Sequence, residues 1–161
     1  MPRDLTNEYD VRAAFYMLGE SVSQRMRENG FQATTLEISV RDSKLLSFTR
    51  QMKLPRPTSL TAELVPAAME LFKRNYRWYK PVRSLGIRGV DLIPDGSVYQ
   101  LNLLEDIDRR EKLENLERLV DRLRDRFGQS SIQRAVHIKE RLKSVNANND
   151  IGDAPTFYAY H

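Results

Sequence analysis

The residues best suited to bind a ligand lie in the stretch 76–92, where basic and aromatic side chains occur close together. The stretch contains four basic residues: Arg77, Lys80, Arg83 and Arg88. Its first acidic residue is Asp91. Cations spaced along an extended segment match the regular phosphates of a nucleic-acid backbone better than a small-molecule pocket. An edge strand that carries Lys and Arg to prevent aggregation explains the same pattern, so this stretch alone leaves both interpretations open.

Positive charge is concentrated in the part of the chain around this stretch. The 161 residues include 26 Lys and Arg against 22 Asp and Glu, for a net charge of +4. Residues 41–90 hold 11 basic residues against three acidic ones, a local balance of +8. Such an excess is evidence about the partner, and it becomes a binding patch only if the fold brings the cations together.

Hydrophobic periodicity predicts the first two elements that would position these residues. Residues 7–29 space apolar side chains three or four apart, which predicts an amphipathic helix with Thr6 or Asn7 as its N-cap. Residues 31–42 alternate with a period of two, which predicts a half-buried strand. Its buried side would carry three apolar residues: Leu36, Ile38 and Val40.

A hairpin follows the first strand. Residues 42–44 form the turn, and residues 45–54 are predicted as the returning strand, which Pro55 and Pro57 end because proline cannot donate to a sheet. One side of this strand combines apolar residues with Arg50, whereas the other side carries only polar groups suited to phosphate oxygens. The pattern leaves open which side is buried.

Residues 58–74 predict a second helix with Thr58 or Thr61 as its cap. Because proline disrupts a helix interior, Pro66 predicts either a start near Val65 or a bend. The stretch 76–92 then supplies the last strand, with Leu85 and Ile87 towards the core. The order helix, strand, strand, helix, strand predicts an α+β fold, an antiparallel sheet with two helices on one face.

The other face of this sheet is predicted to be bare and polar, so residues of separate strands could meet on it. Basic side chains would supply affinity for a phosphate row and small hydroxyl residues would allow close approach. The candidate nucleic-acid contacts are Arg41, Ser47, Thr49, Arg50, Gln51, Lys53, Arg83, Ser84 and Arg88.

The rest of the chain is predicted to be a helical extension, 105–143, and a mobile tail, 144–161. Apolar residues spaced like a short coiled-coil seam predict packing against the sheet domain or a dimer through residues 109–127. The seam consists of Leu113, Leu116, Val120, Leu123 and Phe127. The acidic residues of this region, among them Glu117, are interpreted as solvated helix charges rather than metal ligands.

Three segments of the sequence, taken together, resemble a known family. The segments PRDLTN, NYRWYKPVRSLGIRGVDL and QLNLLED, in this order and spacing, resemble the C-terminal little finger domain of Y-family translesion DNA polymerases, of the DNA polymerase IV and V type. The resemblance covers residues 1–104, and FGQSSIQRA resembles the tail of bacterial members. It implies a little finger DNA-binding domain over residues 1–98 that lies along the template-primer duplex with its sheet face in the major groove.

The resemblance also implies what this chain would lack. The family's domain begins with a strand before PRDLTN, and its catalytic carboxylates with their Mg²⁺ ions belong to an upstream palm domain. We therefore expect a fragment that has no cofactor of its own and cannot polymerise DNA alone. If the missing strand lies at an edge, the strand 82–90 would pair there with another segment or with a neighbouring molecule, which allows a dimer.

Residues 99–104 are expected to bind a sliding clamp, because they resemble the clamp-binding peptide QLxLF of replication proteins with Leu104 in place of Phe. In that resemblance Gln100 hydrogen-bonds at the mouth of a groove, and three leucines fill it. The leucines are Leu101, Leu103 and Leu104. A short apolar run that packs back on the core is the alternative.

Composition narrows the function classes. The absence of cysteine excludes disulfides and thiolate metal sites, and no run approaches the length of a membrane span or a signal, so a cytoplasmic protein without membrane contact is expected. A free-standing DNA-binding regulator that dimerises through residues 109–127 is the alternative to a polymerase fragment. A small hydrolase or transferase ranks last, because no catalytic constellation is present.

Overall fold

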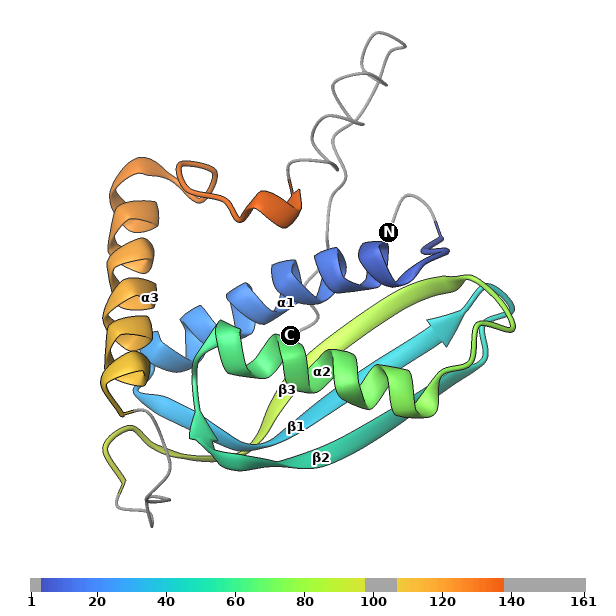
Figure 1. Ribbon diagram of the computed structural model, residues 1–161, viewed down its shortest axis with the longest axis horizontal. Helices are drawn as coiled ribbons and strands as arrows, with labels where there is room; N and C mark the ends of the chain where they lie inside the picture. The colour runs from blue at the N-terminus through green and yellow to red at the C-terminus, as the bar shows by residue number, and fades with distance from the viewer. Residues whose placement is uncertain (1–3, 98–106, 138–161) are drawn as a thin grey trace, which may run out of the picture.

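A three-stranded sheet covered on one face by two helices forms the body of the protein (Figure 1). The computed structural model describes residues 4–97 and 107–137. The elements, in chain order, are α1 (Glu8–Glu28), β1 (Phe31–Asp42), β2 (Ser47–Thr58), α2 (Thr61–Asn75), β3 (Val82–Pro94) and α3 (Ile107–Phe127), followed by a 3₁₀ turn at Ala135–His137. The predicted α+β class and element order are confirmed, as is the presence of a C-terminal helix.

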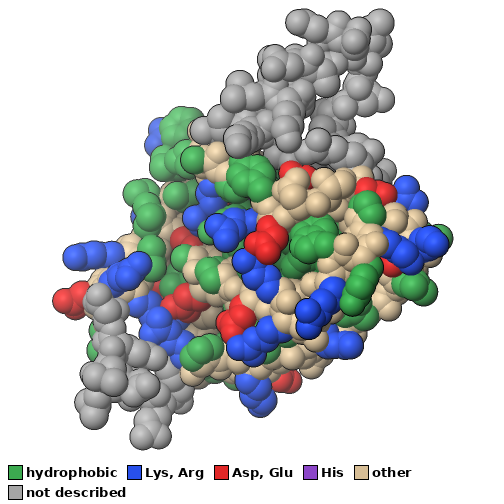
Figure 2. Space-filling view, turned by 45° about the vertical axis from the view of Figure 1, so that its right-hand side comes forward, with side chains coloured by type: hydrophobic (Ala, Val, Ile, Leu, Met, Phe, Trp, Pro, Cys, Tyr) green, Lys and Arg blue, Asp and Glu red, His purple; other side chains and the backbone are tan. Residues whose placement is uncertain are grey.

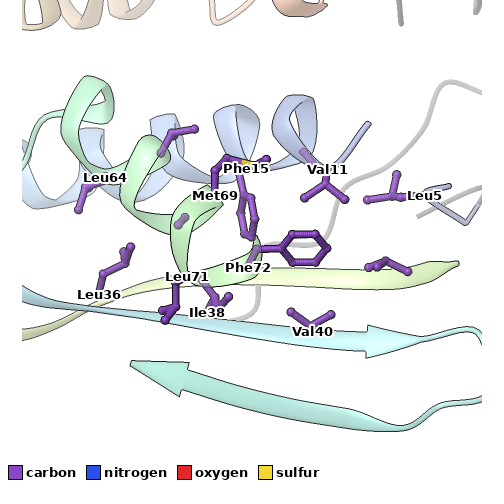
Figure 3. Close-up of a cluster of buried hydrophobic side chains, with 14 of the residues drawn as sticks. Leu5, Val11, Phe15, Leu36, Ile38, Val40, Leu64, Met69, Leu71 and Phe72 are labelled. Atoms are coloured by element: carbon purple, nitrogen blue, oxygen red, sulfur yellow. The ribbon is translucent and has the colours of Figure 1, made fainter. Parts of the chain in front are cut away.

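The core lies between the sheet and the helices α1 and α2 (Figure 3). Phe15 of α1 meets Phe72 of α2 edge to face, with the ring centroids 6.2 Å apart. Both rings are buried against the inner side of the sheet, where β1 contributes the three predicted residues, Leu36, Ile38 and Val40. The alternation of β1 therefore selects the face that the helices cover.

The strands are antiparallel in the order β2-β1-β3, so that β1 is central and the other two are edge strands. The edge position explains why β2 extends to Thr58, beyond Pro55 and Pro57, where we predicted that it would end. An edge strand tolerates a residue without an N–H. The β1–β2 register is irregular between Ala33 and Thr35, beside the prolines.

Two further boundaries differ from the predicted ones. α2 begins at Thr61 and continues through Pro66 without restarting near Val65, and neither predicted threonine caps it. The last strand begins at Val82 rather than Tyr76, so residues 76–81 form a loop between α2 and β3. The hydroxyl of Tyr76 donates to the carbonyl of Lys80 at 2.6 Å within this loop, which bonds the chain to itself instead of to the sheet.

α3 stands at the end of the domain where α1 finishes, and it runs across the other two helices (Figure 1). Its contact with the body is charged. Arg27 of α1 bonds Glu117 at 2.6 Å and Asp121 at 2.7 Å. Glu117 is buried, so the interpretation of this residue as a solvated charge was wrong. The predicted apolar seam is divided: Leu113, Val120 and Leu123 are half-buried, whereas Leu116 and Phe127 are exposed.

A candidate nucleic-acid interface

The uncovered face of the sheet, which we call the open face, carries four cross-strand rows. Residues paired directly across antiparallel strands point to the same side of the sheet. The rows on the side opposite the core, in the order β2, β1, β3, are Ser47–Arg41–Ser84, Thr49–Ser39–Gly86, Gln51–Glu37–Arg88 and Lys53–Thr35–Val90.

Seven of the nine candidate residues meet on this open face. They are Arg41, Ser47, Thr49, Gln51, Lys53, Ser84 and Arg88. Three of the seven are long basic residues, Arg or Lys, and the other four carry hydroxyl or amide groups that can donate to phosphate oxygens. The fold therefore gathers on one surface residues that the sequence separates by up to 47 positions, from Arg41 to Arg88.

Arg50 does not lie on the open face. It pairs with Ile38, whose side chain belongs to the core, and so it points to the helical side at the edge of β2. Its Nε donates to the Oδ1 of Asn75 at 3.2 Å, and its guanidinium lies 5.2 Å from the ring centroid of Phe48. The alternation of β2 groups Arg50 with the apolar residues of the strand, and this side proves to be the helical one, so Arg50 does not join the other candidates.

Arg83 also differs from its predicted position. The β1–β3 register shifts between Arg41 and Asp42, and Arg83 lies at this irregularity, between Val82 and Ser84. Its Nε is 3.3 Å from the Oδ1 of Asp4. An irregular position cannot be derived from strand alternation, because one extra residue reverses the side on which every later side chain emerges.

Only part of the local charge excess converges on the open face. Three of the 11 basic residues in 41–90 are on it: Arg41, Lys53 and Arg88. Other cations pair elsewhere, for example Arg56 with Glu63 and Lys73 with Glu8. Basic side chains accordingly also appear on the side of the molecule shown in Figure 2, among acidic ones. The charge is therefore more dispersed in space than in sequence.

A carboxylate sits in the middle of the open face. Glu37 accepts a hydrogen bond from the side-chain amide of Gln51, and its Oε1 is 3.8 Å from Nη1 of Arg88. The side chain of Arg88 is nevertheless 73% exposed, so it reaches into solvent and remains available to an anion. Among the described residues, Arg41 and Lys53 form no ion pair, although the carboxylate of Asp91 accepts from Thr35 in the same row as Lys53.

Ser39 and Gly86 belong to the open face, although neither was among the candidates. A Cβ on Gly86 would lie 2.3 Å from the Oγ of Ser39, so a side chain there would displace the serine. The row Thr49–Ser39–Gly86, which we call the low row, thus carries only short side chains, and the rows on both sides of it contain longer ones. Ser39 could have been found from the alternation of residues 31–42, whereas the importance of Gly86 depends on a cross-strand neighbour.

The open face is hollowed. One depression is lined there by Ser39, Arg41, Thr49, Gly86 and Arg88, and it continues round the outer edge of β3 to Leu18 and Met26 of α1. A hollow that crosses three strands suits an elongated ligand better than a compact one.

The outer edge of β3 is paired at one end. Leu5 and Val82 exchange two backbone hydrogen bonds, of 2.7 and 2.8 Å. Within the described residues, no other segment pairs along this edge. Pairing with a neighbouring molecule, and with it a dimer, stays a prediction.

The loop between α2 and β3 shields one tyrosine. Burial raises the pKa of the Tyr76 hydroxyl above its ordinary value of 10.0, and the negative charge of Asp42 adds to this effect. The neutral phenol therefore donates to Lys80 throughout the physiological range, and this holds the loop in place.

The described part of the chain has no cluster of three or more His, Cys, Asp or Glu residues arranged to hold a metal ion. No described helix is both long and apolar enough to cross a membrane. The predicted clamp-binding residues 99–104 and the predicted tail 144–161 fall outside the described residues.

Comparison with known proteins identifies relatives for most of the chain. Residues 1–103 match the family model described as impB/mucB/samB family C-terminal domain. DNA polymerase IV of Acetivibrio thermocellus is 41% identical over 140 residues, which are 87% of this chain and 35% of that protein. DNA polymerase IV 2 of Bacillus subtilis is 31% identical over 142 residues, 86% of this chain and 33% of that protein.

The chain thus spans about a third of the length of the curated relatives it matches. A solved structure described as a complex of beta-clamp processivity factor and little finger domain of PolIV is more distant. It has 14% sequence identity and a TM-score of 0.46, and the match covers 66% of this chain and 92% of that chain.

Proposed function

The chain belongs to the impB/mucB/samB C-terminal domain family, and on that basis we propose that its open face holds the template-primer duplex of a polymerase of the DNA polymerase IV type. The observation that carries the proposal is the convergence of seven polar and basic residues from three strands on one hollowed, uncovered surface. Such a surface contacts phosphates without reading bases.

Each type of side chain has a separate part in this proposal. Arg41, Lys53 and Arg88 neutralise phosphates and release counterions, which supplies most of the affinity. The hydroxyl groups of the low row donate short hydrogen bonds where the backbone approaches closely. Because none of these groups requires a particular base, the domain binds duplexes of any sequence, as a polymerase that moves along its template requires.

Charge reversal of two cations tests the proposal. Arg41→Glu with Arg88→Glu should weaken binding to a primed duplex by at least tenfold and flatten the dependence of log K on log salt by about two units, since each phosphate contact contributes about 0.9. Fluorescence anisotropy at several salt concentrations measures both effects.

The matched control reverses two exposed cations of α3, Lys112→Glu with Arg122→Glu, which changes the net charge by the same amount away from the open face. The control should keep the wild-type slope apart from a small long-range effect. Equal losses in both double variants would mean that net charge, and not the open face, governs binding.

We propose a second interface, for a sliding clamp, in residues 99–104. Its support is the resemblance of Gln100, Leu101, Leu103 and Leu104 to the clamp-binding peptide, together with its place at the end of the family match. Burial of a leucine contributes roughly 1.5–3 kcal/mol, which suits a reversible tether.

Gln100→Ala with Leu103→Ala should abolish retention of the chain on an immobilised clamp, while duplex binding by the open face stays unchanged. Asn102→Ala, at the variable position of the motif, is the control and should keep retention. Retention of the double variant at the wild-type level would exclude this peptide as the clamp-binding segment.

Polymerisation itself, with its Mg²⁺ ions, is proposed for a region of the longer protein beyond the matched part, because the relatives are about three times as long as the matched segment. In lesion bypass, this domain would then keep the duplex in place for a catalyst located elsewhere. A dimeric regulator remains the alternative, and the exposed Leu116, Leu119 and Phe127 of α3 favour it. Light scattering that finds a dimer, lost in Leu119→Glu, would support that alternative.

A further inference from the structure

One end of the domain carries an exposed cluster of aromatic, aliphatic and basic side chains, which we call the aromatic corner. It consists of Lys44, Leu45 and Leu46 of the hairpin tip and of Arg77, Trp78, Tyr79 and Lys80 of the α2–β3 loop. The tip of the β1–β2 hairpin and the α2–β3 loop form it together, since the N–H of Ser43 donates to the carbonyl of Pro81 at 3.0 Å. Figure 1 shows both segments at the same end of the molecule.

The ring of Trp78 is fixed against the core on one side, and the neighbouring ring of Tyr79 is exposed. Trp78 places its ring at 5.8 Å from the centroid of Phe72 and 5.7 Å from that of Tyr76, in edge-to-face contacts that lock it on the core. Trp78 itself is 40% exposed, and the neighbouring Tyr79 is 83% exposed. An aromatic residue exposed to this extent contributes little to the core, which makes it available to a ligand.

The corner is also positive. Three of its residues are cations, and the carboxylate of Asp42 beside them is held in the hairpin turn. Oδ1 of Asp42 accepts from the backbone N–H groups of Lys44 at 2.8 Å and Leu46 at 3.0 Å, and its Oδ2 lies 3.9 Å from Nζ of Lys80. Figure 2 shows basic and hydrophobic side chains, with some acidic ones, intermingled on the side of the molecule that is drawn.

The corner is continuous with the open face. The row Ser47–Arg41–Ser84 is the last one of the sheet before the hairpin turn, and Asp42 follows Arg41 directly. Trp78 packs against Phe72 on the helical side of the sheet, so a nucleic-acid strand that leaves the open face at this end passes round the end of the sheet to reach Tyr79 and Trp78. A paired duplex buries its base faces, whereas an unpaired strand offers them to aromatic rings.

We propose that the aromatic corner binds single-stranded DNA, with an unpaired base stacked on Tyr79 and Trp78 and the adjoining phosphates on Arg77 and Lys44. The inference rests on the proposed function, because the duplex on the open face delivers the unpaired strand to the corner. Alternating rings and cations are the usual means by which proteins hold single strands without sequence preference.

Trp78 is the only tryptophan of the chain, so its fluorescence reports on this corner alone. The full chain is titrated with a short oligothymidylate, with a blunt duplex, and with the same duplex carrying an overhang of about six nucleotides, within the usual range of single-strand site sizes. The oligothymidylate and the overhang should quench Trp78, and the overhang should tighten binding several-fold. The blunt duplex should bind without quenching.

Tyr79→Ala should lower the affinity for the oligothymidylate about tenfold, the usual effect of one lost stacking partner, and should remove the advantage of the overhang. Its affinity for the blunt duplex should not change. Phe127→Ala removes another exposed aromatic residue, on α3, and should leave every value at the wild-type level.

Each failure has a different meaning. Blunt-duplex binding with no quenching by either single-stranded probe would overturn this inference and leave the proposed function standing. Quenching of Trp78 by a clamp protein and by no oligonucleotide would overturn it in favour of a protein partner. Absence of binding to any of the three DNAs would overturn the inference and the proposed function together.

Discussion

Asp91 occupies a conformation that few non-glycine residues adopt, with φ of 51°. Two hydrogen bonds hold it: the hydroxyl of Thr35 donates to its carboxylate at 2.7 Å, and the hydroxyl of Thr34 donates to its carbonyl at 2.9 Å. The carboxylate thereby buries Thr35 on the open face and fixes the end of β3 against β1. Asp and Asn tolerate this backbone conformation better than other residues with a Cβ.

Asp91→Ala should lower the free energy of unfolding by about 1–3 kcal/mol, because it removes the acceptor of the Thr35 hydroxyl and keeps the strained backbone. Asp91→Asn keeps an acceptor and the tolerated conformation, so it should cost less than half as much. Urea unfolding monitored by circular dichroism measures both variants. Equal losses would show that charge, and not backbone conformation or hydrogen bonding, determines the role of Asp91.

Single residues on the open face were largely predictable, and the two errors have physical causes. Alternation with a period of two assigns Thr49, Gln51 and Arg88 to their sides once the buried face of β1 is known. Arg50 was included among the contacts for its charge, although the alternation groups it with Phe48 and Met52, on the side that packs against the core. Arg83 was misplaced because the register irregularity is a tertiary feature that no local pattern encodes.

At the scale of elements, α2 has a cap that comes from another helix. Its N-cap residue, Leu60, makes no side-chain cap bond. Glu117 of α3 instead accepts from the backbone N–H of Thr61 at 3.0 Å and of Ala62 at 3.2 Å, as well as from Arg27. A carboxylate at a helix N-terminus satisfies free N–H groups and meets the positive end of the dipole.

Glu117→Ala should lower the free energy of unfolding by about 2–4 kcal/mol, because it uncaps α2 and removes one of two carboxylates around Arg27, whose side chain is 9% exposed. Glu111→Ala, at an exposed position one and a half turns earlier on the same helix, is the control and should change stability by less than about 0.5 kcal/mol. Thermal unfolding measures both. If both variants unfold like the wild type, α3 does not stabilise the body.

This docking could not be predicted from the sequence. The seam of leucines on α3 indicated an apolar contact, whereas the structure uses the charged side and leaves Leu116 exposed. The cap joins residues 56 positions apart, and nothing near Thr61 signals that its partner is a distant glutamate. By contrast, α1 begins at its predicted cap, Asn7, because that cap is local.

At the scale of the whole molecule, periodicity was sufficient for the architecture. The apolar pattern of α1, β1 and β3 determines which side of each element faces the core, and the layer arrangement follows. The resemblance to the C-terminal domain of the DNA polymerase IV type, seen in the order of three segments, is confirmed by the family match over residues 1–103. The sequence left open whether the cations converge, because proximity in sequence does not indicate on which side of the sheet a cation emerges, and only Arg41, Lys53 and Arg88 lie on the open face.

The most direct test of the account is an amide map of the chain by ¹H–¹⁵N NMR during titration with a primed duplex of arbitrary sequence. If the open face holds the duplex, the largest shifts fall on the open-face positions of β1, β2 and β3, including Arg41, Thr49 and Arg88, with little change along α1 and α2. Shifts concentrated on the helices, with the open-face amides unmoved at saturation, would contradict it.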